Sequence, residues 1–396
     1  MTYRDRARGC LLGLAAGDAL GAPAENLTPE EIRHRWGRLT EIEGGGTDDT
    51  EYAIFAAGLL AEHGHGLTSA LVAAAYRERV IPAVTGPMRG AGFSELGTVQ
   101  ALRRGLEPPL TGLVHQHGWS DGLAMRAAPY GVFCPGDPAE AARLVTEDGR
   151  VSQSGEGILG GRAVAAAVAA AMAGADPSDA VEAALSAVPA DSWTARNIVR
   201  ARAALGAADP AVALHEAVVV RHYPWTDLAP EAVALALAAY LHGEGDVERS
   251  VTFGVSLGRD ADTIGAIAGA VAGASQGERG VPERWAARIG PVTGRCLPVV
   301  AGRDIRDVAD DLATAHATAS TRATRPGRAG ENPAGSGPPG GTTTESAGTP
   351  GSAALPRPAG SAGAAGRPPA GPGGSADAAG GGTAGPDAGD ERMEGL

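Results

Sequence analysis

Two short segments of the chain gather aspartate and threonine side chains just ahead of stretches that are typical of helices. The first is GGGTDDTEYA, residues 44–53, and the second is LGRDADTIGA, residues 257–266. Glycine and other small neighbours in both segments allow a ligand to approach the backbone closely. The candidate ligand groups are Thr47, Asp48, Asp49, Asp260, Asp262 and Thr263.

Carboxylates as close together as these need a stabilising environment, because two desolvated negative charges repel each other. A helix N-terminus is one such environment, since its free N–H groups and its dipole favour anions. A hard divalent cation is another, since Mg²⁺ and Mn²⁺ prefer carboxylate and hydroxyl oxygens. The residues alone leave both interpretations open. If the segments meet, they suit one or two such ions, whereas no set of Cys and His residues suits zinc.

The elements that must position these segments are expected to be helices almost throughout. Alanine dominates and period-2 alternation is nearly absent, so the pattern predicts a compact all-α fold, with Val218–Tyr223 as the one short strand candidate. Capping residues, Pro in first turns and terminal Gly residues mark the helix ends. The expected helices span Asp5–Ala16, Asp48–His63, Thr68–Val80, Gly161–Ala173, Pro177–Val188, Pro230–Leu241 and Thr263–Ala274.

Composition divides the 396 residues into a folded body and a tail. The sequence contains 60 Gly and 28 Pro residues, and beyond residue 316 these alternate mainly with Ala, Ser and Thr. Such a segment buries too little apolar surface to offset the entropy lost on ordering it. We therefore expect a domain over residues 1–316 and a disordered tail over residues 317–396. The formal net charge of −13 argues against a nucleic-acid-binding surface.

The beginning of the chain imitates a signal peptide, with basic residues at Arg4–Arg8 followed by an apolar stretch. Asp18 interrupts this stretch, and Gly13, Gly17 and Gly21 weaken it as an apolar segment. The three cysteines are scattered, which favours a reducing compartment over a disulfide framework. The expectation is a cytoplasmic protein without a membrane partner.

Five segments, in this order, closely resemble the ADP-ribosylglycohydrolases, the family that includes the dinitrogenase-reductase-activating glycohydrolases. They are GDALGAPAE at 17–25, GTDDT at 46–50, SDGLAMRAAP at 120–129, the stretch 151–172, and GRDADT at 258–263. Each motif alone is weakly specific, whereas five in the family's order are a strong signal. The resemblance runs from Arg4 to about Arg303, so the tail falls outside it.

The resemblance implies an all-α, compact orthogonal helical domain with a binuclear metal site. Two Mg²⁺ ions, or Mn²⁺ in their place, would be held by Thr47, Asp48, Asp49, Asp260, Asp262 and Thr263. Glu25 and Asp49 would be the catalytic carboxylates. The implied reaction is hydrolysis of the N- or O-glycosidic bond that joins ADP-ribose to a side chain, through an oxocarbenium-like state. The expected partner is therefore an ADP-ribosylated protein or a small ADP-ribosyl or ribosyl compound.

The resemblance also implies a set of substrate-binding residues: Ser120, Asp121, Gly122, Met125, Arg126 and Gln153. Backbone N–H groups around Gly122 and the Ser120 hydroxyl would face the diphosphate. Arg126 has two interpretations, as a phosphate contact or as a structural ion-pair partner. Trp119, beside this loop, either stacks on adenine or packs at the rim.

Two departures from the family pattern bear on the substrate. Asp121 stands where the family commonly has Asn, which adds an anion near the expected diphosphate. Gln153 stands where His commonly follows Ser or Thr, and Gln does not shuttle protons near neutral pH. Two alternatives to the glycohydrolase follow: a non-catalytic ADP-ribose-binding or structural relative, and a hydrolase of another small nucleotide or riboside.

Overall fold

The computed structural model describes residues 1–86, 88–223 and 225–324, apart from the side chains at 320 and 322–324. The expected tail therefore lies outside the described residues, except for its first part. Helix α18 (Ile305–Thr324) runs across the boundary expected at residue 316. Its buried residues Val308 and Leu312 anchor it against α1 and α3, and Ala and Thr continue the helix beyond them.

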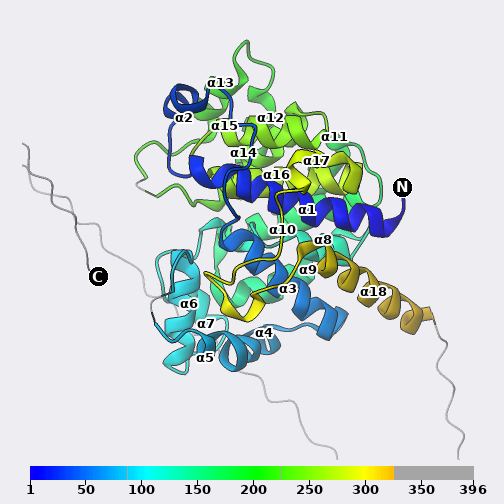
Figure 1. Ribbon diagram of the computed structural model, residues 1–396. Coiled ribbons are helices and arrows are strands. Elements are labelled where there is room, and N and C mark those ends of the chain that lie inside the picture. Colours follow the sequence, from blue (N-terminus) through cyan, green and yellow to red (C-terminus); the bar gives the residue numbers. More distant parts are fainter. Residues whose placement is uncertain (87, 224, 325–396) are drawn as a thin grey trace, which may run out of the picture. The chain divides into compact units, whose positions relative to one another are not determined.

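The described residues fold into helices joined by short loops (Figure 1). The α-helices are α1 (Tyr3–Gly21), α2 (Pro29–Trp36), α3 (Asp48–His63), α4 (Ser69–Ala75), α5 (Ile81–Ala83), α6 (Phe93–Arg103), α7 (Leu110–Leu113), α8 (Ala128–Phe133), α9 (Pro138–Ser152), α10 (Gly155–Met172), α11 (Pro177–Ser186), α12 (Trp193–Ala204), α13 (Pro210–Val218), α14 (Ala229–His242), α15 (Val247–Ser256), α16 (Ala261–Gln276), α17 (Glu283–Ala286) and α18 (Ile305–Thr324). Shorter turns are the 3-10 helices η1 (Ala22–Ala24), η2 (Gly64–Gly66), η4 (Asp121–Leu123), η5 (Glu278–Gly280) and η6 (Pro298–Val300), and the π-helical turn η3 (Tyr76–Val80).

The expected all-α class is confirmed, since the described residues form no strand and one isolated bridge joins Ser120 to Leu228. The strand expected over Val218–Tyr223 is wrong. Val218 ends α13, and the backbone N–H of Val220 donates to the Glu231 carboxylate at 2.8 Å. A side chain, instead of a neighbouring strand, satisfies this part of the backbone.

Helix α3 coincides with its expected range because its capping residues are local. Thr47 is its N-cap, and Gly64, with a φ of 52°, follows its last residue. A positive φ is easily adopted by Gly, so the helix ends there. The same device ends α16, where Gly277 has a φ of 76°.

Helices α1 and α16 lie side by side at the centre of the fold and run antiparallel (Figure 1). Their contact consists of glycines four residues apart on each helix. A Cβ atom on Gly13 would lie 2.2 Å from the carbonyl oxygen of Gly269, and one on Gly17 would lie 2.0 Å from that of Gly265. The two backbones therefore touch, which only residues without a side chain allow. The complete sets are Gly9, Gly13, Gly17 and Gly21 on α1, and Gly265, Gly269, Gly273 and Gly277 on or next to α16.

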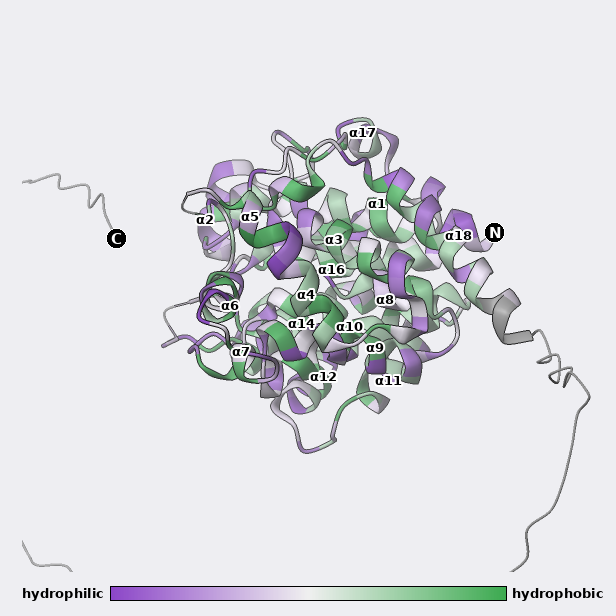
Figure 2. Ribbon diagram, turned by 90° about the horizontal axis from the view of Figure 1, so that it is seen from below, coloured by the Kyte–Doolittle hydropathy of each residue, from purple (hydrophilic) through white to green (hydrophobic). Residues whose placement is uncertain are grey.

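This antiparallel contact decides what meets at the end of the pair. The C-terminal end of α1 lies beside the N-terminal end of α16, and α3 packs against both. Other helices (α10, α14 and α15) cover α16, and hydrophobic residues concentrate inside while polar ones lie outside (Figure 2). Among the described residues, α10 is the one helix whose length and composition would allow it to cross a membrane, and 67% of it is buried within the fold.

Candidate metal centre

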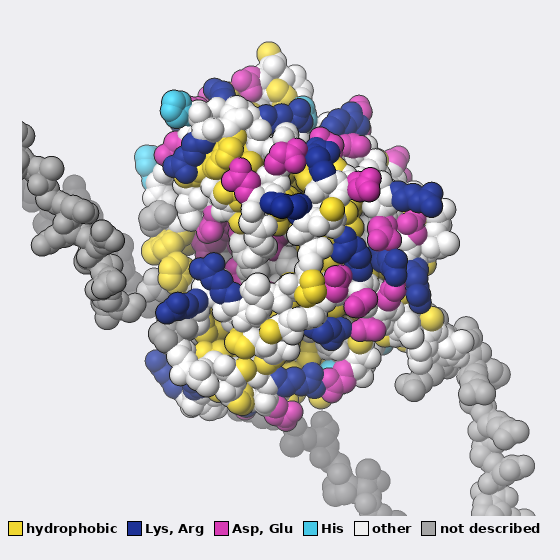
Figure 3. Space-filling view, viewed as in Figure 1, with side chains coloured by type: hydrophobic (Ala, Val, Ile, Leu, Met, Phe, Trp, Pro, Cys, Tyr) yellow, Lys and Arg dark blue, Asp and Glu magenta, His cyan; other side chains and the backbone are white. Residues whose placement is uncertain are grey.

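A cavity of about 500 Å³ opens where α1, α3 and α16 converge. Asp48 and Asp49 form the first turn of α3, while Asp260 and Asp262 lie at the start of α16. Both pairs line the cavity, although more than two hundred residues separate them in sequence. Glu25, which follows η1, lines it as well. Acidic side chains lie in a hollow on this face of the molecule (Figure 3).

The two segments are in direct contact. The Thr263 hydroxyl donates to Asp49 Oδ1 at 3.3 Å. Carboxylate oxygens of Glu25, Asp260 and Asp262 lie within 4.8 Å of one another. The structure therefore brings together the residues that the sequence predicted as metal ligands and the predicted catalytic Glu25.

Backbone hydrogen bonds hold Glu25 beside the second segment. The N–H of Asn26 donates to the carbonyl of Arg259 at 2.8 Å, and the N–H of Arg259 donates to the carbonyl of Leu27 at 3.1 Å. The Asn26 amide also donates to the Glu25 carboxylate at 3.1 Å. The loop after α1 and the loop before α16 thus form one unit.

Helix capping explains Thr47 and does not explain the carboxylates. The Thr47 hydroxyl accepts from the N–H of Asp49 at 3.4 Å, as an N-cap does. Asp260 occupies the N-cap position of α16 but makes no capping hydrogen bond. Asp48 accepts from the N–H of Gly92, outside its own helix, at 3.0 Å. Capping alone is therefore insufficient as an interpretation of the two acidic segments.

Oδ2 of Asp49 and Oδ1 of Asp262 are among the buried carboxylate oxygens that lack any hydrogen-bond partner within the described part of the chain. Buried charged oxygens without partners are strongly unfavourable. A hard divalent cation would satisfy both, since it binds carboxylate and hydroxyl oxygens. The residues present therefore fit the divalent cations that the sequence predicted.

The carboxylates also raise one another's pKa. Burial, followed by the nearby charge of Asp262, raises the pKa of Asp49 well above its usual value. Burial and then Asp260 do the same for Asp262. Burial, with a smaller contribution from Asp18 and Asp227, raises the pKa of Glu25. Such an arrangement holds negative charge poorly unless positive charge joins it.

The raised pKa values of these carboxyl groups make the stability of the metal-free protein depend on pH. A carboxyl whose pKa is higher in the folded than in the unfolded state stabilises the fold when protonated, and this stability is lost as the pH rises through the folded value. In EDTA, the midpoint of thermal unfolding should therefore rise as the pH falls from about 8 towards the ordinary Asp pKa near 4. Saturating Mg²⁺ should reduce this dependence. Thermal scans across this pH range, with and without Mg²⁺, measure the effect, and an EDTA midpoint that falls on mild acidification would contradict it.

Asp18 is a residue of the site for which the sequence analysis found no role. It is fully buried on α1 and accepts hydrogen bonds from the N–H groups of Thr47, at 2.8 and 3.0 Å, and Thr50, at 3.2 Å. The Thr50 hydroxyl donates to it as well. Asp18 therefore caps α3 from another helix and positions the Asp pair. Its signal in the sequence is a single acidic residue inside the apolar stretch that forms the second half of α1.

The sequence analysis also missed Asp227, Glu51 and Glu95, which line the cavity, and the last two contact neighbouring segments. Glu51 is 4% exposed and accepts from three successive N–H groups of residues 295–297, at 2.6 to 2.9 Å. Glu95 is fully buried, accepts from Ser94 at 2.5 Å and forms an ion pair with Arg126 at 2.8 Å. Both hold neighbouring segments in place around the cavity.

The predicted substrate-binding residues fall into two groups. Ser120, Asp121, Gly122 and Met125 line the cavity, whereas Arg126 and Gln153 lie behind its wall. Asp121 is 3% exposed, and its Oδ2 has no hydrogen-bond partner among the described residues. Burial, followed by Asp227 and Asp262, raises its pKa well above the usual value. Asp121 therefore belongs with the carboxylate cluster.

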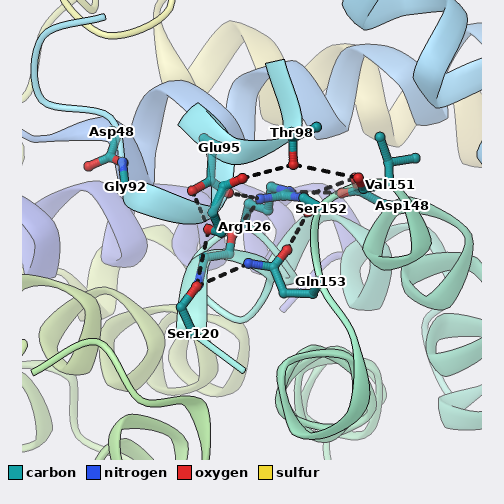
Figure 4. A network of polar contacts seen from close by, with 12 residues as sticks. Asp48, Gly92, Glu95, Thr98, Ser120, Arg126, Asp148, Val151, Ser152 and Gln153 are labelled. Carbon is teal, nitrogen blue, oxygen red and sulfur yellow. Dashed lines mark hydrogen bonds and ion pairs between the residues drawn. The ribbon is translucent and has the colours of Figure 1, made fainter. Parts of the chain in front are cut away.

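Arg126 lies in a buried polar network (Figure 4). All five of its N–H groups donate within the protein: to Asp148 at 2.9 and 3.2 Å, Glu95 at 2.8 Å, the Gly122 carbonyl at 2.5 Å and Ser152 at 2.7 Å. No donor remains for a phosphate, so the position supports the ion-pair interpretation of Arg126 over the substrate contact.

Gln153 closes a ring of hydrogen bonds in the same network (Figure 4). Its carbonyl oxygen accepts from the Ser152 hydroxyl, and its amide donates to the Ser120 hydroxyl at 3.1 Å. Ser120 in turn donates to Ser94 at 3.1 Å, which leads back to Glu95 and Arg126. Gln153 therefore orients Ser120 from behind and does not itself face the cavity.

Of the two interpretations of Trp119, its position favours packing, and other aromatic residues line the cavity. Trp119 does not line the cavity, and it packs edge-on against Trp193 with ring centroids 6.2 Å apart. Phe93 and Trp225 do line it, and both are partly exposed. His117 lies between them, stacked on Phe93 at 4.8 Å and edge-on to Trp225 at 5.5 Å.

A family model described as ADP-ribosylglycohydrolase matches residues 1–322 of this chain. The chain belongs to the ADP-ribosylglycohydrolase family. The match covers nearly all of the described residues and both acidic segments, and the family resemblance expected from the motifs is confirmed. This family acts on ADP-ribosylated substrates and is generally metal-dependent, which agrees with a carboxylate cluster at the cavity.

The chain is also similar to individual proteins, two of which carry an ADP-ribosylglycohydrolase description. An uncharacterised protein of Archaeoglobus fulgidus is 32% identical over 296 residues, which cover 71% of this chain and 90% of that protein. The ADP-ribosyl-[dinitrogen reductase] glycohydrolase of Rhodospirillum rubrum is 30% identical over 163 residues, or 39% of this chain and 53% of the enzyme. A solved structure described as an ADP-ribosylglycohydrolase-related protein complex has a TM-score of 0.56 and 26% identity, with 80% of this chain and 99% of that chain covered.

Proposed function

We propose that this protein is a divalent-cation-dependent hydrolase that cleaves the glycosidic bond between ADP-ribose and a protein side chain or small acceptor. The observation that supports it most is the meeting of Asp49 and Asp262, from two distant segments, with buried oxygens that lack partners in the described part of the chain. Membership of the ADP-ribosylglycohydrolase family supports the substrate class.

In this proposal the cluster holds two Mg²⁺ ions, with Mn²⁺ as the alternative, through Thr47, Asp48, Asp49, Asp260, Asp262 and Thr263. Divalent cations there would supply Lewis acidity that activates water and orients the ribose hydroxyls. Asp18 keeps Thr47 and the Asp pair in position through its hydrogen bonds. Asp121 adds a carboxylate on the same side of the cavity.

Glu25 is the proposed proton-transfer group, with Asp49 as the second catalytic carboxylate. Glu25 is the exposed member of its cluster, whereas Asp260 and Asp262 are buried. Solvent and an acceptor can therefore reach it. Cleavage develops positive charge at the anomeric carbon, so a carboxylate must exchange a proton with the water or the leaving group. Met125 and Gly122, which also line the cavity, would contact the ribosyl group.

The test measures the release of ADP-ribose from ADP-ribosyl-arginine and from ADP-ribosylated protein. Each substrate is assayed with Mg²⁺, with Mn²⁺ and with EDTA. The expected result is turnover with a divalent cation and none in EDTA. Glu25→Gln should lower kcat by roughly 10²–10⁴-fold, the usual contribution of general acid–base catalysis. Binding of ADP-ribose without turnover of any linkage would favour the non-catalytic alternative, and full turnover in EDTA would contradict the proposal.

A further inference from the structure

The lining of the cavity has a large excess of negative charge. Nine acidic side chains line it, and Arg89 and Arg295 are the two basic residues in that lining. Even two divalent cations leave the carboxylates in excess. A ligand with a diphosphate would therefore meet a negative environment unless it reached positive groups outside the centre.

The sequence predicted that the Ser120–Gly122 loop contacts the diphosphate. Several hydrogen-bonding groups of this loop already have partners within the protein. The N–H of Asp121 donates to the carbonyl of Asp227 at 2.9 Å, and the N–H of Gly122 donates to Ser120 at 3.5 Å. The Ser120 hydroxyl donates to Ser94 and accepts from Gln153. The carboxylate of Asp121 adds a negative charge there. The loop therefore offers an anion few free hydrogen-bond donors and no positive charge.

Arg89 and Arg295, unlike the loop, carry positive charge and have free hydrogen-bond donors. Both are exposed at the cavity rim, and within the described residues neither guanidinium takes part in an ion pair or hydrogen bond. They also lie near each other, since a Cβ on Gly90 would be 3.9 Å from Nε of Arg295. Basic side chains stand beside the hollow in the space-filling view (Figure 3).

The backbone around both arginines is tied to the acidic centre. Glu51, two residues after Asp49, accepts from the N–H of Arg295 at 2.9 Å. Asp48 accepts from the N–H of Gly92, three residues after Arg89, at 3.0 Å. The rim arginines are thus held at a defined place relative to the cluster, while their side chains remain free to reach a ligand.

We infer that Arg89 and Arg295 form a diphosphate-binding subsite of this protein at the cavity rim. The inference rests on the proposed function, because it assigns the phosphates of an ADP-ribosyl ligand to one edge of the same cavity. Guanidinium groups bind phosphate oxygens through paired, charge-assisted hydrogen bonds. The ribosyl end then lies over the carboxylates and the diphosphate lies at the rim.

Calorimetric titration with ADP-ribose in Mg²⁺ tests the subsite. Arg89→Ala and Arg295→Ala should each raise the Kd roughly five- to tenfold, and the double variant should raise it more. The affinity of the double variant should also depend less on salt than that of the native protein, since rim charges set salt dependence. In turnover of ADP-ribosyl-arginine, KM should rise while kcat stays nearly unchanged.

Arg200→Ala is the matched control, because Arg200 is exposed on α12 and does not line the cavity. It removes the same charge and should leave the Kd, KM and salt dependence unchanged. Unchanged thermal midpoints show that the rim variants are folded, and lysine at either position should restore part of the affinity.

Three other outcomes are distinguishable. If the native protein hydrolyses ADP-ribosyl-arginine and the double variant matches it in Kd, KM and salt dependence, the subsite is wrong and the proposed function stands. If the double variant loses turnover of ADP-ribosylated protein alone, with free ADP-ribose bound normally, the arginines contact the acceptor and the inference is overturned. If the native protein neither binds ADP-ribose nor cleaves any ADP-ribosyl linkage, the proposed function fails and the inference with it.

Discussion

Replacing Asp49 and Asp262 together by asparagine is expected to abolish turnover. Both carboxylates carry a buried oxygen without a partner among the described residues, and they stand on the two segments that meet at the cavity. Asparagine keeps the shape of the side chain and removes the charge that a divalent cation requires. We expect kcat/KM to fall at least about a thousandfold, which corresponds to about 4 kcal/mol.

The same substitutions should stabilise the metal-free protein. Asp49 and Asp262 are buried among other carboxylates, so neutral amides relieve repulsion and desolvation at neutral pH. In EDTA, the thermal midpoint of Asp49→Asn/Asp262→Asn should exceed that of the native protein by a few degrees, about 1–2 kcal/mol for a domain of this size. The rise in midpoint that Mg²⁺ gives the native protein should disappear.

Asp191→Asn is the control, because Asp191 is exposed and lies outside the cavity lining. It should change neither turnover nor the response to Mg²⁺. Full turnover by the double variant, or an undiminished response to Mg²⁺, would show that these two residues do not hold a cation.

Alanine at Gly17 should destabilise the protein, although alanine normally favours helices. A Cβ at this position would lie 2.0 Å from the carbonyl oxygen of Gly265, so α1 and α16 must move apart. Overpacking of this kind costs about 1–3 kcal/mol or more. Activity should fall too, since neighbouring Asp18 would shift relative to Thr47. Urea unfolding and turnover measure the two effects.

Gly58 offers a matched comparison in α3. It is exposed, and a Cβ there would have no atom within 4 Å. Gly58→Ala should therefore stabilise the protein by about 0.5–1 kcal/mol through helix propensity alone. Equal stability changes for Gly17→Ala and Gly58→Ala would contradict the close contact between α1 and α16.

Local signals were sufficient to predict where many helices begin and end. Thr47 and Gly64 mark the ends of α3 in the sequence as they do in the structure. Gly243 similarly follows the end of α14. These residues act through hydrogen bonds and dihedral angles of their own neighbourhood. The composition-based boundary at residue 316 stays a prediction, and helix α18 spans that position, because an alanine- and threonine-rich segment can continue a helix as readily as it begins a tail.

The long-range contacts at the site could not be predicted in the same way. Gly13, Gly17 and Gly21 looked like interruptions of an apolar stretch, and the structure shows them as the surface on which α16 packs. Spacing by four residues was the available signal, since glycines at that interval share one helix face. This spacing indicates a helix contact only together with a second helix that has glycines at the same interval. That helix, α16, lies some 250 residues later in the chain.

Structural roles that depend on partners distant in sequence could not be predicted from the sequence either. Asp18 caps α3 across 29 to 32 positions, and Glu51 holds a loop some 245 positions away. The family motifs placed the two Asp segments at one site without such contacts. Motif position does not tell which side of the cavity wall a side chain faces, and the structure places Arg126 and Gln153 in the buried network behind that wall.

The most direct measurement is a crystal structure of the protein soaked in Mn²⁺, with diffraction recorded at an energy where manganese scatters anomalously. The expected result is one or two anomalous peaks between Asp48 and Asp49 on one side and Asp260 and Asp262 on the other. Oxygen ligands should lie at distances normal for such ions, at roughly 2.0–2.6 Å. Anomalous peaks only elsewhere on the molecule, at saturating Mn²⁺, would contradict a shared divalent-cation centre.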